Sequence, residues 1–229
     1  MLKKLKEEVF KANIDLYKSG LVIHTWGNVS GIDYENRIMV IKPSGIAYEN
    51  MTADDMVVVD LEGEIIGGRL KPSSDSPTHL ELYRNFPCAG GIVHTHSTYA
   101  TAWAQAGLSI PAMGTTHADH FYGDIPCTRR LEPGETENDY ELNTGKVIAE
   151  SFKYLDAKAI PAVLVNDHGP FAWGGSASEA VYNAIVLEET ARMAFLTYSL
   201  AGDDRIDKHL LDKHYNRKHG RDAYYGQKK

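Results

Sequence analysis

The chain has 229 residues, of which 43% are hydrophobic and 24% charged, and its formal net charge is −7. This composition is typical of a globular protein with a large core, and it excludes a disordered chain and a membrane protein. The negative charge argues against broad nucleic-acid binding, and Cys88 and Cys127 are too few for a disulfide scaffold. The first residues mix acids into an amphipathic pattern unlike a secretory signal, so we expect a cytoplasmic protein with no membrane partner.

The N-terminal third predicts one helix followed by short strands. Apolar residues recur at steps of three and four over residues 2–16, which predicts a helix that ends near Gly20. Short apolar segments follow at 21–25, 38–41, 56–61 and 65–66. Glu62-Gly63 lies between the last two segments and predicts a hairpin turn. Ser76-Pro77 then opens a helix that reaches about Tyr83, because proline favours the first helical position.

The rest of the chain alternates further strands and helices. A strand over residues 90–96 is followed by a helix near 98–105, a loop-rich stretch over 107–134, a helix over 139–154 and a strand that ends at His168. A capping box at Ser176 and Glu179 opens a long helix, and a short helix covers about 207–218. No repeat or composition break divides the chain, so we expect a single domain over residues 1–229. Because tight turns connect several strands, we predict an α/β fold with a largely antiparallel sheet.

Two histidines close the strand Gly90-Gly91-Ile92-Val93-His94-Thr95-His96. Alternate side chains of a strand share a face, so both imidazoles project to one side with their Cα atoms about 6.5–7 Å apart. A third histidine, His168, ends the apolar run 162–165 and precedes a glycine. Three imidazoles with an open position are a common ligand set of catalytic zinc, which makes an enzyme the first hypothesis. Spacing alone leaves open that these are ordinary polar residues at strand ends.

Three loops of small polar residues offer groups that suit a phosphate. They are Trp26-Gly27-Asn28, Lys42-Pro43-Ser44-Gly45 and Lys71-Pro72-Ser73-Ser74-Asp75. Backbone N–H groups, hydroxyls and lysines that converge are typical of anion sites, although the same residues are common in turns. The chain has no Walker or dinucleotide glycine motif, which disfavours a nucleotide.

Other polar residues have both a structural and a functional interpretation. Asp75 precedes a predicted helix, where it stabilises the helix start or lies near a metal. Asp119 lies in a polar loop, and such loops often carry catalytic side chains. His214, Arg217 and Tyr225 lie in a basic C-terminal segment, where a tyrosine packs or supplies a phenolic proton.

Together these motifs carry a family resemblance. The chain resembles the L-ribulose-5-phosphate 4-epimerases of the class II sugar-phosphate aldolase superfamily, from its first helix to its tail. The residues that carry the resemblance are Thr25-Trp26-Gly27-Asn28-Val29-Ser30, Ile41-Lys42-Pro43-Ser44-Gly45, Met51-Thr52-Ala53-Asp54-Asp55-Met56, Lys71-Pro72-Ser73-Ser74-Asp75, His94-Thr95-His96, Thr115-Thr116-His117-Ala118-Asp119 and Ala223-Tyr224-Tyr225-Gly226-Gln227.

The resemblance implies an α/β/α three-layer fold and a homotetramer with sites between adjacent subunits. It implies Zn²⁺ held by His94, His96 and His168, with Asp75 adjacent or ligating; Mn²⁺ or Co²⁺ also suits three histidines. The substrate contacts that it implies are Gly27, Asn28, Lys42, Ser44, Gly45, Ser73 and Ser74. It makes Asp119 and Tyr225 the acid/base pair. Tyr225 then acts on substrate held by the adjacent subunit, with His214 and Arg217 contributing.

The implied reaction interconverts L-ribulose 5-phosphate and D-xylulose 5-phosphate by a retro-aldol route. The C4 hydrogen is not adjacent to the C2 carbonyl, so direct deprotonation is too costly. In the implied route Zn²⁺ polarises the carbonyl, the C3–C4 bond breaks, and the bond re-forms after glycolaldehyde phosphate has rotated. Two acid/base groups are expected because the C4 oxygen points in different directions before and after rotation.

Two other functions stay open. A class II aldolase that releases the aldehyde, such as one acting on L-fuculose 1-phosphate, carries a glutamate near the metal where this chain has Asp75. A non-catalytic, adducin-like interaction domain is the other alternative. The three histidines and Asp119 argue against it.

Overall fold

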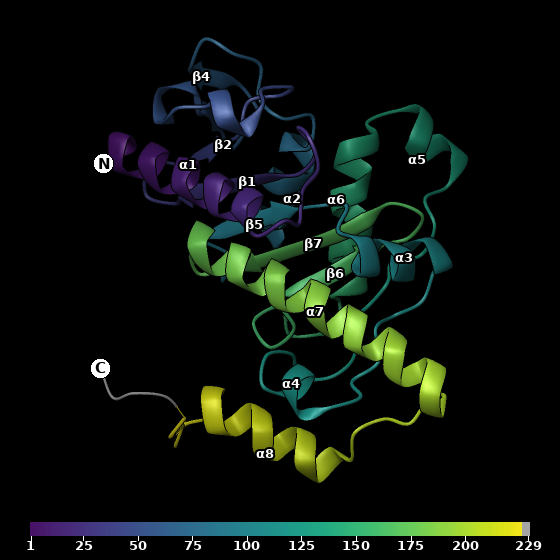
Figure 1. Ribbon diagram of the computed structural model, residues 1–229. Coiled ribbons are helices and arrows are strands. Elements are labelled where there is room, and N and C mark those ends of the chain that lie inside the picture. Colours follow the sequence, from purple (N-terminus) through teal and green to yellow (C-terminus); the bar gives the residue numbers. More distant parts are fainter. Residues whose placement is uncertain (226–229) are drawn as a thin grey trace.

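The structure, a computed structural model, describes residues 1–225, which contain a seven-stranded sheet flanked by helices (Figure 1). The sheet order is β4-β3-β2-β1-β5-β7-β6, and each pairing between these strands is antiparallel. The strands are β1 (Asn28–Asp33), β2 (Ile38–Ile41), β3 (Val57–Asp60), β4 (Ile65–Gly67), β5 (Gly91–His94), β6 (Ala162–Val165) and β7 (Gly169–Gly174).

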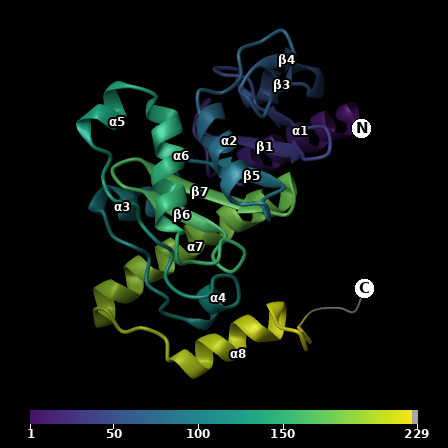
Figure 2. The same cartoon turned by 180° about the vertical axis from the view of Figure 1, so that it is seen from behind.

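Helices cover both faces of the sheet. The α-helices are α1 (Leu2–Lys18), α2 (Ser76–Asn85), α3 (Thr98–Ala106), α4 (Thr115–Ala118), α5 (Pro133–Glu137), α6 (Tyr140–Ser151), α7 (Ala177–Ala201) and α8 (Lys208–His219), and the 3₁₀ turns are η1 (Tyr48–Asn50) and η2 (Ala53–Asp55). The α1 and α7 helices lie on one face, and α2 and α6 lie on the other (Figures 1 and 2). The predicted three-layer α/β/α arrangement around an antiparallel sheet is therefore confirmed.

Residues at the centre of the sheet determine how closely the helices pack against it. On the α7 side, a Cβ at Gly91 would lie 2.4 Å from the Ala177 backbone, so only glycine lets the helix approach this closely. On the α2 side, the Ser30 hydroxyl lies 2.7 Å from Nδ1 of His79 and 2.8 Å from the Tyr83 hydroxyl. These contacts hold α2 against β1 through a buried polar chain.

The strands that hold or adjoin the candidate histidines are buried throughout. Each residue of β5, β6 and β7 is buried, as expected for strands covered on both faces. Trp173 of β7 packs against both Phe86 and Phe152, with ring centroids 4.8 and 5.1 Å away. The ends of these strands are therefore anchored in the core, and residues just beyond them have well-defined positions.

The C-terminal helix lies apart from the sheet. It begins after Asp207, lies next to α4, and buries Leu211 (Figure 1). In both views α4 and α8 lie at one end of the molecule (Figures 1 and 2). Among the helices of residues 1–225, none has the length and apolar character needed to cross a bilayer.

Several element predictions differ from the structure. Residues 21–25 form no strand, whereas β1 begins at Asn28, where a loop was predicted. Strand β7 was missed because its sequence, Gly-Pro-Phe-Ala-Trp-Gly, has few strand-favouring residues. It is a strand because β5 and β6 pair with it on both sides. The stretch 107–134, predicted to be rich in loops, contains the short helix α4, and α5 begins at its end.

Candidate active site

His94 ends β5 at a point where three strands meet. In the ladders on either side of β5, His94 lies opposite Asn28 of β1 and Phe171 of β7. Residues opposite one another in an antiparallel pair share a face, so all three side chains project together toward α2 and α6. The Phe171 ring stacks on the His94 imidazole with centroids 4.2 Å apart. Sheet pairing and stacking therefore fix the orientation of this imidazole.

His96 and His168 reach the same place from two turns. His96 lies two residues beyond the end of β5, and His168 ends the β6–β7 turn after Asp167, whose φ is 62°. One nitrogen from each of the three histidines lies within 4.8 Å of the others, and the Nε2 atoms of His94 and His96 are 3.2 Å apart. The three imidazoles converge as the sequence predicted, although His96 lies outside the strand.

The chemistry of these imidazoles fits a divalent cation. Nδ1 of His94 donates to the Pro170 carbonyl oxygen at 3.0 Å, which leaves the Nε2 lone pair free. Burial and the neighbouring histidines lower the pKa of His96, and they lower the pKa of His168 to about 3. Neutral imidazoles are the form that binds metals, and three converging nitrogens are a familiar donor set for zinc.

The histidines open into a cavity of about 420 Å³, which we call the histidine cavity. It is lined by Thr25, Trp26, Gly27, Asn28, Lys42, Pro43, Ser44, Gly45, Ser73, Ser74, Asp75, His94, His96, Tyr140, Glu141 and His168. All the residues predicted to bind metal line this cavity. The residues of the three polar loops that were predicted to contact the substrate line it as well. The structure thus brings together segments that are far apart in the sequence.

The two Lys-Pro-Ser loops lie side by side in this cavity. The Ser44 amide donates to the Lys71 carbonyl oxygen, and the Ser73 amide donates to the Lys42 carbonyl oxygen, both at 3.0 Å. Gly27 passes close to β5 with φ of 80°, and a Cβ there would lie 2.9 Å from the His94 carbonyl oxygen. Glycine is therefore required where this loop crosses the end of the sheet.

Lys42 is a buried ammonium group at the wall of the cavity. Its Nζ donates to the Pro43 carbonyl oxygen at 3.3 Å and lies 4.7 Å from the centre of the Tyr48 ring. Within residues 1–225 no carboxylate forms an ion pair with it. Burial lowers the pKa of Lys42 to about 8, because water no longer solvates the charge fully. An anion in the cavity would restore that stabilisation.

Asp75 lies in the cavity but outside the three-histidine group of the described chain. Its Oδ2 accepts a hydrogen bond from Nδ2 of Asn28 at 2.6 Å. Burial opposes ionisation of Asp75, but His94, His79 and the Asn28 hydrogen bond outweigh it and lower the pKa of the carboxyl. Asp75 is the N-cap residue of α2, yet its side chain makes no capping hydrogen bond. Its side chain therefore serves the cavity rather than the helix end.

The predicted acid/base residues, Asp119 and Tyr225, lie in a separate group, the Asp119 cluster, which also contains His214, Arg217 and Lys218. The Asp119 carboxylate accepts hydrogen bonds from Nη2 of Arg217 at 2.6 Å and from Nδ1 of His214 at 3.0 Å. Nζ of Lys218 lies 3.7 Å from it. Burial would raise the pKa of Asp119, but these partners together lower it. The Tyr225 ring lies 4.7 Å from both the Arg217 and the Lys218 cation.

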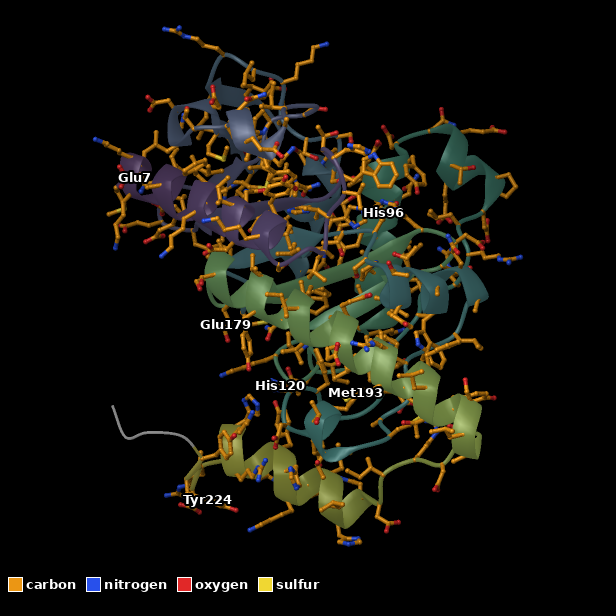
Figure 3. All side chains as sticks on the ribbon, viewed as in Figure 1. Glu7, His96, His120, Glu179, Met193 and Tyr224 are labelled. Carbon is orange, nitrogen blue, oxygen red and sulfur yellow. The ribbon has the colours of Figure 1, made fainter. Side chains whose placement is uncertain are left out.

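The Asp119 cluster and the histidine cavity are apart within one chain. None of the cluster residues lines the cavity. Figure 3 shows His96 beside α6 and Tyr224, the neighbour of Tyr225, beyond the end of α8 at the other end of the molecule. Gly226 and Gln227 of the C-terminal motif lie outside the described residues.

A family model described as the Class II Aldolase and Adducin N-terminal domain matches residues 7–195. The chain belongs to this family. Class II aldolases typically depend on a divalent metal, which agrees with the three converging histidines.

Individual relatives include epimerases and aldolases of this family. The chain is 58% identical over 228 residues to L-ribulose-5-phosphate 4-epimerase UlaF of Salmonella paratyphi A and of Salmonella typhi, covering 99% of this chain and 100% of each relative. A solved L-fuculose 1-phosphate aldolase is 26% identical with a TM-score of 0.79, covering 93% and 95% of the two chains. YgbL of Klebsiella pneumoniae is 28% identical with a TM-score of 0.73, covering 93% and 98%.

Sequence reasoning missed some residues of the histidine cavity. Tyr140 and Glu141 line it from the start of α6, and the Tyr48 hydroxyl donates to the Gly27 carbonyl oxygen at 2.8 Å from beneath the loop. Tyr140 and Glu141 could have been proposed from the sequence, because they form a polar pair at the start of a predicted helix. Tyr48 gave no such signal, because its role depends on packing that only the folded chain reveals.

Proposed function

We propose that this chain is an enzyme that interconverts L-ribulose 5-phosphate and D-xylulose 5-phosphate by epimerisation at C4. The observation that carries this function is the 58% identity, over nearly the whole chain, to L-ribulose-5-phosphate 4-epimerases. The histidine cavity supplies the chemistry that such a reaction needs, because it combines three metal-binding imidazoles with two loops suited to a phosphate.

In this proposal His94, His96 and His168 hold a divalent cation, with Asp75 adjacent to it or ligating it. Zinc is the first choice for three imidazoles, and Mn²⁺ or Co²⁺ are the alternatives. When bound, the cation withdraws electrons from the substrate carbonyl. The hydrogen bond from Asn28 to Asp75 keeps the Asp75 carboxylate in place beside the histidines.

The substrate phosphate binds where the three polar loops meet. We assign it to the backbone and side-chain donors of Gly27, Asn28, Lys42, Ser44, Gly45, Ser73 and Ser74. The buried Lys42 ammonium supports this assignment, since it has no acidic partner in the described chain and gains stability when an anion arrives. A phosphate held at this wall stays fixed while the aldehyde half of the cleaved substrate rotates.

Asp119 and Tyr225 carry the proton transfers at the C4 oxygen. One of them accepts the proton of the C4 hydroxyl as the C3–C4 bond breaks. After rotation, the other returns a proton to the same oxygen as the bond re-forms on the opposite carbonyl face. Asp119 is ionised near neutrality and accepts a proton, whereas the Tyr225 phenol can donate one. His214 and Arg217 hold Asp119 and bind the substrate beside it.

Because the Asp119 cluster lies apart from the histidine cavity of its own chain, we propose that it completes the cavity of an adjacent copy. A homotetramer with sites between neighbouring subunits is the assembly that we expect. In a ring, each chain offers its histidine cavity to one neighbour and its Asp119 cluster to the other. A single domain over residues 1–229, a small sugar phosphate as the partner, and a cytoplasmic location remain parts of this proposal.

A coupled assay for D-xylulose 5-phosphate tests the function. The purified protein is supplied with L-ribulose 5-phosphate, with and without a chelator, and then with Zn²⁺, Mn²⁺ or Co²⁺ added back. We expect D-xylulose 5-phosphate to form, to stop forming after chelation, and to form again with at least one metal. Metal-free protein with no activity under any of these conditions would instead support an adducin-like interaction domain.

A class II aldolase that releases its aldehyde is the second candidate, favoured by the structural similarity to L-fuculose 1-phosphate aldolase. The same assay separates the two, because an aldolase accumulates glycolaldehyde phosphate and an epimerase does not. A second measurement follows hydrogen exchange at C4 in deuterated water. Cleavage and re-formation of the C3–C4 bond leave the hydrogen on C4 in place. Exchange of that hydrogen with solvent during turnover would therefore exclude the retro-aldol route.

A further inference from the structure

Tyr140 contacts one of the three histidines from outside the ligand set. It is the first residue of α6, and its hydroxyl lies 3.1 Å from Nδ1 of His168. The two rings have centroids 6.1 Å apart, and the half-buried tyrosine also lines the histidine cavity. Tyr140 therefore lies where it can control the orientation of His168 without being a ligand itself.

The hydrogen-bond partners of the histidines decide which nitrogen is free. For His94, the Pro170 carbonyl oxygen can only accept, so Nδ1 carries the hydrogen and Nε2 keeps its lone pair. For His168, the partner that the described residues provide on Nδ1 is the Tyr140 hydroxyl, which can either donate or accept. If the hydroxyl accepts, His168 has the same tautomer as His94. If it donates, the Nδ1 lone pair of His168 is taken by Tyr140 and Nε2 carries the hydrogen.

We propose that Tyr140 is a positioning residue that accepts a hydrogen bond from Nδ1–H of His168 and so leaves Nε2 of His168 for the cation. This inference rests on the proposed metal centre. A hydroxyl that accepts this hydrogen bond still carries its own hydrogen. That hydrogen remains available to a second acceptor in the cavity. Partners of this kind on metal-bound imidazoles fix ring orientation and increase ligand basicity.

The test removes the hydroxyl alone. Tyr140→Phe keeps the ring and loses the contact with His168, whereas Tyr154→Phe makes the same change at a tyrosine that is 87% exposed. Metal-free proteins are titrated with Zn²⁺ in competition with a chromophoric chelator, and melting temperatures are measured without metal. We expect Tyr140→Phe to bind Zn²⁺ about 10–100-fold more weakly than the wild type, with Tyr154→Phe unchanged.

The outcomes separate this inference from the metal centre on which it rests. Wild-type protein that binds Zn²⁺ as tightly as Tyr140→Phe would overturn the role of Tyr140 and leave the metal centre standing. Wild-type protein that binds no Zn²⁺ would overturn both. If Tyr140→Phe does not fold, ¹⁵N NMR of histidine-labelled, metal-free wild type decides. The Nδ1–H tautomer of His168 supports the proposal, and the Nε2–H tautomer contradicts it.

Discussion

The histidine cavity and the Asp119 cluster are built by different parts of the fold. The cavity lies at the ends of central strands, where ladder pairing sets the positions of Asn28 and His94. The cluster lies at the end of the short α4, on α8 and just beyond α8, outside the sheet (Figure 1). The groups proposed to bind the metal and the phosphate are thus held by the core, whereas the groups proposed to transfer protons lie at the periphery. A neighbouring copy can approach the peripheral groups without disturbing the sheet.

The two regions also differ in how their charges are compensated. Lys42 is a buried cation with no acidic partner among the described residues, whereas Asp119 is an anion in contact with Arg217, His214 and Lys218. An anion that binds in the cavity would therefore stabilise the uncompensated charge of Lys42. The cluster, with more cationic than anionic side chains, would be attracted to the same phosphorylated substrate from the other side.

Removing one imidazole gives the largest expected effect. In His96→Ala, two histidines remain, so we expect bound metal to fall well below one equivalent and turnover to fall to the background of the assay. Elemental analysis and the coupled assay measure these two quantities. His209→Ala, at an exposed histidine of α8, is the matched control and should keep both. If His96→Ala keeps its full metal content and turnover, the proposed three-histidine metal centre is wrong.

Removing the phenol of the Asp119 cluster should affect turnover but not metal. We expect Tyr225→Phe to lower kcat about 10²–10⁴-fold, the usual range for loss of a general acid/base, with metal content unchanged. Tyr224→Phe is the control, since Tyr224 lies next to it and its ring lies beneath the Lys213 ammonium rather than the Arg217 guanidinium. If metal is lost in Tyr225→Phe to the same extent as activity, the tyrosine has a structural role.

Lys42 should give the cavity its own pH dependence. Its pKa is lowered to about 8, so above that pH the free enzyme loses the ammonium charge that attracts the phosphate. We expect kcat/KM to fall by up to about tenfold per pH unit above this value, because kcat/KM reports groups of the free enzyme. Lys42→Met should have lower kcat/KM throughout and lack this decline. A decline of equal steepness in Lys42→Met would assign it to another group.

Mixing two inactive chains tests whether one site draws on two copies. His96→Ala lacks an intact cavity, and Tyr225→Phe lacks an intact cluster. If each site combines parts of neighbouring subunits in a ring, random co-assembly in equal amounts restores about one quarter of wild-type activity. The coupled assay after joint dissociation and reassembly measures this. Activity that stays at the sum of the two single variants would place both regions in the same chain's site.

The sequence predicted the layers and the convergence of the histidines better than it predicted the pairings that create the cavity. Strand alternation predicted that His94 and His96 converge, although His96 lies beyond the end of β5, and helix periodicity located the long helices. The bridge between Pro43 and Pro72 could not be predicted, because it joins two turns through long-range packing. Strand β7 was missed for the same reason: its neighbours, rather than its residues, make it a strand.

The Asp119 cluster shows a different limit of sequence reasoning. Asp119 and Arg217 are distant in the chain, and no spacing rule brings them into contact. Their association with one site came from the family resemblance, and the structure adds that they pair with each other. Tyr140 was not predicted because its role depends on one hydroxyl-to-imidazole contact across the cavity.

The positions of the three histidines along the chain affect the stability of the folded protein. His94 ends a strand near the middle of the sheet and His96 follows it closely, whereas His168 belongs to a hairpin turn much later in the chain. In the proposed metal centre, a cation shared among them would close that long loop and act as a reversible cross-link. Ligands that bind only the native state stabilise it, so saturation at 100 times the dissociation constant adds about 2.7 kcal/mol. Metal supply would thus govern resistance to proteolysis as well as turnover.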